Sequence, residues 1–323
     1  MPDCQTILEK CRKFRHRIYS PLKTVLMFVK QGLASDKSCK NSVNNTIAKN
    51  LCGAETAKKI SASTGSYCKA RQRIPGETIE QLVSASGKLP LNTSPDSWKA
   101  FGRAIKVTDG TMVKMADTKK NQVAYPQHSN QKKGLGFPLA RLVVVMSITG
   151  TILDYSIGAN KEKGTGEASL LRNIFDNCIE TQDILLGDRY FPSYFLIADL
   201  LIKGADGIFR GQSQRHYDFR SGKKLGKKDH IVAWIKPRKP EWMTQDAYDA
   251  YAETIQVREF KVGGNVYVTT FLDEKQYLKN KLAAIYKRRW DVEIDLRSIK
   301  DVMKMDMLVC KTPDMVKKEI GEF

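Results

Sequence analysis

The sequence predicts a mixed α/β core preceded by a basic helical domain, and two observations support this fold class. Residues 1–98 show apolar side chains at helical spacing, with breaks at proline and glycine. After Trp98 the pattern changes to short β-branched runs that alternate with amphipathic segments. Alternating strands and helices are typical of an open α/β sheet.

The strand and helix order narrows the fold further. We predict strands over 104–109, 139–148 and 151–157, a helix over 166–180, a strand over 183–186, a helix over 192–203 and a strand over 207–210. This is the order of the ribonuclease H-like, or retroviral-integrase-like, fold. Asp109 ends the first predicted strand and Asp188 follows the fourth, and open α/β sheets collect their chemistry at strand ends.

Residues 273–307 are predicted to form one long amphipathic helix. At about 100° per residue, four of its side chains fall within an arc of about 60°, and these are Tyr286, Arg289, Glu293 and Lys300. A solvated charge stripe is the ordinary explanation of such a face. The aromatic on the same arc, and the two aspartates upstream, favour a functional one.

Asp109, Asp188 and Glu293 together suggest a metal-dependent reaction. An aspartate at a strand end is by itself ordinary turn chemistry. Three converging carboxylates, however, repel one another unless cations lie between them, and a pair of divalent ions is the usual means of activating a phosphodiester. With four histidines and seven scattered cysteines lacking a C-x-x-C pair, any metal site must use carboxylates, which suits Mg²⁺ or Mn²⁺.

Charge and composition indicate a nucleic-acid partner. The chain of 323 residues carries a formal charge of +19, with 41% hydrophobic residues, which excludes a chain that is disordered throughout. The longest apolar run, 142–148, is too short to span a bilayer. The charged amino terminus is unlike a signal peptide, and the cysteine pattern predicts reduced thiols in the cytoplasm.

The amino-terminal region is predicted to be a helical DNA-binding domain, with a helix-turn-helix as one possibility and a plain packing domain as the alternative. Lys69, Arg71 and Arg73 cluster near its end and are candidate DNA-binding residues. We expect domain 1–98 to end in a linker at 87–97, followed by the first part of the core at 99–210. A basic β-rich insertion at 211–271, with a hairpin turn at Gly263–Gly264, precedes residues 272–323, which complete the core.

Several motifs resemble the DDE transposases of bacterial insertion sequences, in the group named after insertion sequence four. The helix matches that group's Tyr-x2-Arg-x3-Glu-x6-Lys pattern, and the segments around Asp109 and Asp188 resemble its two aspartate motifs. The segments GFPLARL (136–142) and SYCKARQRIP (66–75) are also similar. The resemblance covers nearly the whole chain.

The resemblance implies cut-and-paste DNA transposition without a covalent protein intermediate. Asp109, Asp188 and Glu293 would hold two Mg²⁺ ions, for which Mn²⁺ substitutes, and the partners would be transposon terminal repeats and target DNA. Tyr286, Arg289 and Lys300 would contact phosphates. Arg189 is either a DNA contact or a structural ion-pair partner, and Trp234 is a candidate for holding a displaced base, with a core position as the alternative.

The carboxyl end departs from the family pattern, because members continue beyond the short helix expected after Lys311-Thr312-Pro313-Asp314. We therefore expect a shortened chain. Three functions stay open: an active transposase of the nucleoid that works as a homodimer, a truncated protein that only binds transposon ends, and another ribonuclease H-like nuclease.

Overall fold

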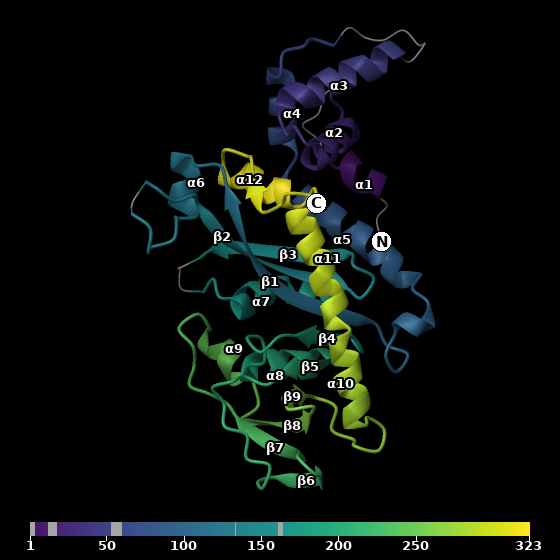
Figure 1. Ribbon diagram of the computed structural model, residues 1–323, viewed down its shortest axis with the longest axis vertical. Coiled ribbons are helices and arrows are strands. Elements are labelled where there is room, and N and C mark those ends of the chain that lie inside the picture. Colours follow the sequence, from purple (N-terminus) through teal and green to yellow (C-terminus); the bar gives the residue numbers. More distant parts are fainter. Residues whose placement is uncertain (1–3, 12–17, 53–59, 133, 161–163) are drawn as a thin grey trace. The chain divides into compact units, whose positions relative to one another are not determined.

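The computed structural model describes residues 4–11, 18–52, 60–132, 134–160 and 164–323 (Figure 1). The chain divides into two compact units. One comprises Met1–Lys88, Met112–Ala140 and Leu296–Phe323, and the other comprises Leu89–Thr111 and Arg141–Asp295. We call the first the terminal unit and the second the catalytic unit. The predicted domain boundaries at 98, 210 and 271 stay predictions.

Within the described residues, ten strands form one sheet in the order β3-β2-β1-β4-β5-β9-β8-β7-β6, with β10 beside β1. The first five strands are β1 (Ile105–Met115), β2 (Leu139–Ser147), β3 (Ile152–Ala159), β4 (Ile184–Gly187) and β5 (Asp206–Arg210). β1, β4 and β5 are parallel, whereas β2 and β3 are joined by a short turn. This confirms the predicted ribonuclease H-like strand order.

Two amphipathic helices bury the apolar face of these strands. They are α7 (Glu167–Cys178) and α8 (Tyr194–Lys203), and α7 packs on β3. Leu171 of α7 and Ile197 of α8 are fully buried in the same core cluster as Val145 and Leu185 of the sheet. Burying such side chains contributes about 1.5–3 kcal/mol each, so this core holds β4, after which Asp188 follows, in place.

The insertion is continuous with the main sheet. Its elements are β6 (Lys223–Gly226), β7 (Asp229–Ile235), α9 (Gln245–Asp249), β8 (Thr254–Val262) and β9 (Asn265–Thr269). β9 pairs antiparallel with β5, and β8 and β9 meet at Gly263 and Gly264, whose φ values of 56° and 83° suit a tight hairpin turn. The predicted hairpin is confirmed.

Trp234 of β7 is a core residue. Its side chain is buried, and its indole N–H donates to Glu259 Oε1 over 2.9 Å. The Arg215 guanidinium lies 3.9 Å from the ring centroid. These contacts occupy the ring, so the structure favours the core position over a role in holding a displaced base.

The predicted single helix over 273–307 is wrong in its bounds. The structure has α10 (Lys279–Lys287) and α11 (Arg289–Asp301), separated by a turn at Arg288 where the Asp291 N–H bonds to the Arg288 carbonyl three residues back. Asp273 instead accepts backbone N–H bonds in the preceding loop, and Lys304, at φ 58°, stops continuation of the helix. β10 (Met307–Leu308) then pairs in parallel with β1.

The terminal unit begins with helices, as the sequence predicts for its amino-terminal region. They are α1 (Cys4–Glu9), α2 (Pro21–Leu33), α3 (Cys39–Cys52), α4 (Gly65–Arg73) and α5 (Gly76–Asn92). α2 starts at Pro21, where a missing N–H costs nothing. Met27, Val43 and Tyr67 form a small core between α2, α3 and α4.

The predicted linker at 87–97 is partly wrong, because α5 continues through it to Asn92 with Pro90 inside the helix. Pro90 lies in the last turn, so the helix loses few backbone bonds there. The Ser94 hydroxyl also donates to the Pro90 carbonyl over 2.8 Å. A short 3₁₀ turn, η1 (Asp96–Trp98), follows.

Two short helices complete the terminal unit. α6 (Lys119–Ala124) is capped by Thr118, and α12 (Pro313–Ile320) is capped by the Thr312 hydroxyl, which accepts from the Met315 N–H over 3.4 Å. The predicted helix start at Thr312-Pro313 is therefore confirmed. Glu319 of α12 accepts the backbone N–H groups of Val309 and Cys310 over 2.9 and 2.8 Å, which ties β10 to the helix.

Two buried glutamates near α12 are expected to respond oppositely to replacement by glutamine. Glu319→Gln weakens two charge-assisted bonds and should lower the free energy of unfolding by about 1.5–3 kcal/mol. Glu322 is buried with neither carboxyl oxygen hydrogen-bonded within the described residues, and burial raises its pKa to about 9, with Arg71 opposing the rise. The unfolded chain therefore releases a proton that the folded chain keeps.

The raised pKa of Glu322 determines whether stability rises or falls with pH. Stability should fall by about 1.4 kcal/mol per pH unit as pH rises between the unfolded pKa of about 4.5 and the folded pKa of about 9. Glu322→Gln should thus protect α12 amides from hydrogen exchange at pH 8 relative to wild type, and the difference should vanish near pH 4. An unchanged difference across this range would contradict the assignment.

All seven cysteines are free thiols in the structure, as the sequence predicts. Among the helices that the described ranges contain, none has the length and apolar character required to cross a membrane.

Candidate active site

Asp109 and Asp188 lie at equivalent positions along two neighbouring parallel strands. β1 and β4 are parallel, and Val107 lies opposite Leu186, so the residues two positions further along each strand stand at one edge. Asp109 lies inside β1, which continues to Met115 and does not end at Asp109 as predicted. Asp188 follows directly after β4, where it accepts the Tyr190 backbone N–H over 2.8 Å.

Arg289 connects these strands to the helices. Its guanidinium donates from Nη2 to Glu293 Oε2 over 3.1 Å, and its Nη1 lies 3.9 Å from Asp109 Oδ1. α10, which carries Tyr286, lies next to β5 and β8, and α11 begins at Arg289. The side chain of Arg289 is only 8% exposed, which strengthens its attraction to both carboxylates. Asp109, Asp188 and Glu293 therefore all lie within electrostatic range of the Arg289 guanidinium.

Burial and the negative charge of neighbouring carboxylates make Asp109 and Asp188 reluctant to ionise. Burial raises the pKa of Asp109 to about 6, with Asp188 and Glu293 adding to the rise and Arg289 opposing it. Burial also raises the pKa of Asp188, again against the opposing charge of Arg289. Perturbed carboxyl groups of this kind cluster at functional sites because a positive charge is needed to hold them ionised.

Glu167 is a fourth carboxylate that the sequence did not single out. It lies in the first turn of α7, and a Cβ added at Gly110 would come within 2.6 Å of its carboxyl carbon. Burial and then the charge of Asp188 raise its pKa. An acid in the first turn of a helix is ordinary dipole compensation, so the sequence carried no signal that distinguished it.

A hollow of about 420 Å³ adjoins Glu167 and is also lined by Arg141 and Tyr190. Arg141 is held by bonds from its guanidinium to Thr165 O and Asn160 Oδ1 over 3.0 and 3.4 Å. Tyr190 is 69% exposed, although it lies two residues after Asp188. The candidate site thus opens onto an aromatic and a fixed cation.

The donor chemistry of the site fits a divalent cation. Its carboxylate oxygens are the ligands that hard cations such as Mg²⁺ prefer, and burial raises the pKa values of Asp109 and Asp188. The described part of the chain contains no group of three or more His, Cys, Asp or Glu side chains already arranged to hold an ion. Arg289 occupies the position of counter-charge between Asp109 and Glu293.

The remaining predicted site residues are placed differently from one another. Tyr286 is buried, and its ring packs edge-on against Tyr267 with centroids 5.2 Å apart, so the structure favours a positioning role over phosphate contact. Arg189 is exposed beside Asp188. Lys300 lies further along α11, in the part of that helix that belongs to the terminal unit.

Lys69, Arg71 and Arg73, which are close in the sequence, differ in their exposure to solvent. Lys69 and Arg73 are exposed on α4, whereas Arg71 is buried. The Arg71 guanidinium bonds to Gln31 Oε1 and lies 4.7 Å from the Phe28 ring centroid. Arg71 is therefore a packing residue and not an accessible DNA contact, which corrects its assignment; DNA contact stays a prediction for the other two.

Replacing Arg289 by glutamine is expected to raise the pKa of Asp109 above about 6, since the guanidinium is the main group holding it down. Carbon-13 NMR of labelled aspartate in metal-free protein measures this directly. Arg288→Gln, on the neighbouring turn, is the matched control and should leave the Asp109 titration where it is. A fall in the Asp109 pKa would contradict the contact.

Comparisons with known proteins find similarity to transposases. Residues 100–321, roughly two-thirds of the chain, match the family model described as "Transposase DDE domain". The transposase InsG for insertion sequence element IS4 of Escherichia coli (strain K12) is 22% identical over 261 residues, which are 78% of this chain and 57% of that protein. The transposase for insertion sequence element IS421 of Escherichia coli is 29% identical over 63 residues, which are 20% of this chain and 17% of that one.

Among solved structures, a piggyBac transposase synaptic complex with hairpin DNA aligns with 98% of this chain and 69% of its own, at 8% identity and a TM-score of 0.48. The chain spans little more than half the length of the IS4 transposase. The residues that match the family model, 100–321, include Asp109, Asp188 and Glu293. On this evidence the chain belongs to the family of DDE transposases.

Proposed function

We propose that this chain is a DNA transposase that cleaves phosphodiesters at the ends of its own element and joins the freed 3′-hydroxyl ends to target DNA. One observation carries the proposal: Arg289 lies between Asp109 and Glu293, while the register of β1 and β4 brings Asp188 level with Asp109. Such a constellation of half-buried acids suits metal-assisted phosphoryl transfer. DDE transposases generally depend on divalent metal ions, which agrees with the donor set.

Asp109, Asp188 and Glu293 would hold two Mg²⁺ ions, with Mn²⁺ as a substitute. When bound, the ions activate the attacking oxygen and stabilise the leaving oxygen of an in-line displacement. The chain's own contribution is to place the carboxylates. β1 and β4 hold two of them on rigid strands, and Arg289 fixes the rotamer of Glu293 through the 3.1 Å bond.

Tyr286 would help to position Arg289, whose guanidinium lies 5.8 Å from the centroid of the tyrosine ring. Lys300 and Arg189 would contact phosphates flanking the scissile bond. The partner would be double-stranded DNA of the terminal repeats and the target, bound in the bacterial nucleoid. Synapsis of two ends requires at least a homodimer.

The test is cleavage of a duplex that carries the element's own terminal repeat, with Mg²⁺ or Mn²⁺, by wild type and by Glu293→Gln. Nicking at the element boundary by wild type alone supports the proposal. Cleavage that is indifferent to the end sequence would indicate another ribonuclease H-like nuclease. Specific binding without any nick would indicate a protein that only occupies transposon ends.

A further inference from the structure

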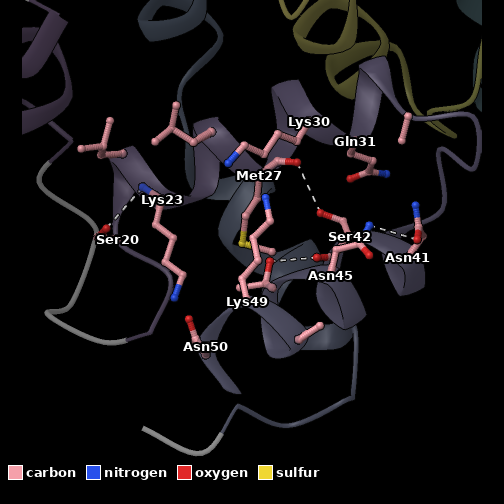
Figure 2. A pocket seen from close by; sticks show the side chains of 15 residues that line it. Ser20, Lys23, Met27, Lys30, Gln31, Asn41, Ser42, Asn45, Lys49 and Asn50 are labelled. Carbon is pink, nitrogen blue, oxygen red and sulfur yellow. Dashed lines mark hydrogen bonds between the residues drawn. The ribbon is translucent and has the colours of Figure 1, made fainter. Parts of the chain in front are cut away.

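A groove of about 670 Å³ lies between α2 and α3 of the terminal unit and is lined by cationic, amide and apolar side chains (Figure 2). Leu22, Leu26 and Met27 are among the apolar residues that line it. The polar side chains labelled in Figure 2 include the lysines Lys23, Lys30 and Lys49 and the amides Asn41, Asn45 and Asn50.

The helices that form the groove, α2 and α3, carry an excess of positive charge. Between Pro21 and Cys52 the sequence contains five lysines and a single acid, Asp36. Asp36 lies in the α2–α3 turn, where its carboxylate accepts the Ser38 N–H over 2.8 Å. Lys37 is directed to the Met303 and Lys304 carbonyls. The other four lysines lie on α2 and α3, so the complementary partner is a polyanion.

The amides on α3 are ordered before any partner binds. Asn41 donates to the Asp36 carbonyl over 2.8 Å, and Asn45 donates to Asn41 Oδ1 over 3.1 Å. This leaves Asn45 with its Oδ1 acceptor and a second N–H to present outward. A paired acceptor and donor of this kind match the N6 and N7 edge of adenine in the major groove. A neighbouring Leu22 or Leu26 side chain suits contact with a thymine methyl group.

The arrangement of the helices agrees with groove entry. α2 and α3 are joined by a short turn and held by the core of Met27, Val43 and Tyr67, and the Ser42 hydroxyl donates to the Met27 carbonyl over 3.3 Å. In two-helix DNA readers the second helix enters the major groove and its first turns reach the base edges. Asn41 and Asn45 lie in the first two turns of α3.

We propose that α3 is the element that reads the terminal repeat, with Asn45 contacting an adenine and Lys23, Lys30 and Lys49 contacting backbone phosphates on either side. This rests on the proposed transposase function and names the face that gives it sequence specificity. Asn41 is a positioning residue, since it fixes the Asn45 amide. The residues that line this groove do not include Lys69 and Arg73, which are exposed on α4.

Binding of the full chain to duplexes, followed by fluorescence anisotropy without cleavage, tests the lysines. Lys23→Gln/Lys30→Gln/Lys49→Gln should weaken binding to the terminal repeat and to a scrambled duplex by the same factor. The slope of log K against log salt should fall by about 1 per lysine removed. Lys119→Gln/Lys120→Gln, at exposed positions of α6, is the control and should leave the slope nearly unchanged; a slope that falls in this control but not in the triple variant would overturn the proposal.

Asn45→Ala tests base reading. It should reduce discrimination between the terminal repeat and the scrambled duplex by roughly tenfold, with the salt slope unchanged. Asn44→Ala, at an exposed α3 position beside it that does not line the groove, should keep full discrimination. Replacing one adenine of the repeat by 7-deazaadenine should reproduce the loss in wild type and add nothing in Asn45→Ala.

The outcomes separate this inference from the proposed function. If the triple lysine variant binds DNA as wild type does, the groove serves an acidic protein partner instead, while end cleavage by wild type still stands. If wild type shows neither cleavage nor preference for the repeat, the proposed function fails as well. Circular dichroism confirms that each variant is folded, which the exposure of these side chains leads us to expect.

Discussion

Replacing Glu293 by glutamine is expected to lower the rate of end cleavage by at least about 10³-fold while leaving DNA binding within a factor of about two. The change is isosteric, so the 3.1 Å contact from Arg289 can be kept through the amide oxygen. What is lost is the negative charge that would hold a divalent ion. Single-turnover cleavage gives the rate, and anisotropy gives the affinity.

Asp291→Asn is the matched control for Glu293→Gln. Asp291 lies in the first turn of the same helix, α11, but its side chain is exposed. Removing this charge costs a small helix-dipole contribution of about 0.3–1 kcal/mol and should leave the cleavage rate close to wild type. Equal loss in both variants would show that cleavage depends on the stability of α11 and not on a carboxylate at Glu293.

Much of the sheet could be predicted because some of its strands, such as β2 and β4, are largely buried on both faces. The β4 sequence ILLG and the run 142–148 are apolar and end in turn residues, which leaves few alternatives. The break between α10 and α11 could not be predicted. Arg288 has nearly helical dihedral angles, φ −61° and ψ −17°, and the interruption is only a shift of hydrogen bonds to the carbonyl three residues back.

The candidate site shows both the strength and the weakness of sequence patterns. Asp109, Asp188, Arg289 and Glu293 were expected from strand ends and one helix face, and the structure brings them within electrostatic range. Arg71 was misassigned although the sequence held the correction. Lys69 and Arg73, four residues apart, share a helix face, whereas Arg71 points about 200° away and so enters the core.

The groove between α2 and α3 could not be predicted from the sequence, for a different reason. Its lysines are spread over two helices, and Asn45 gains its orientation from Asn41, whose own amide is fixed by a carbonyl in the preceding turn. Neither feature leaves a dense charge run in the sequence. Only the packing of α2 on α3 gathers these side chains around one groove.

The largest stability effect is expected at Arg258 of β8, which is 1% exposed. It bonds to both carboxylate oxygens of Asp229 over 2.8 and 2.7 Å and to the Tyr277 carbonyl over 2.7 Å. The side chain thereby ties β7 and β8 to the loop that leads into α10. Arg258→Ala leaves a buried carboxylate without its partner and should lower the free energy of unfolding by about 3–5 kcal/mol.

Urea denaturation followed by tryptophan fluorescence measures this loss, because all four tryptophans belong to the catalytic unit. Arg220→Ala is the control, since the Arg220–Asp218 pair is exposed to solvent and should contribute little to stability. The double variant Arg258→Met/Asp229→Leu should recover most of the loss, because no unpaired charge stays buried. End cleavage should follow the same order, since α10 leads into the turn before Arg289. A double variant no more stable than Arg258→Ala would mean that the bond to the Tyr277 carbonyl, and not the ion pair, holds the loop in place.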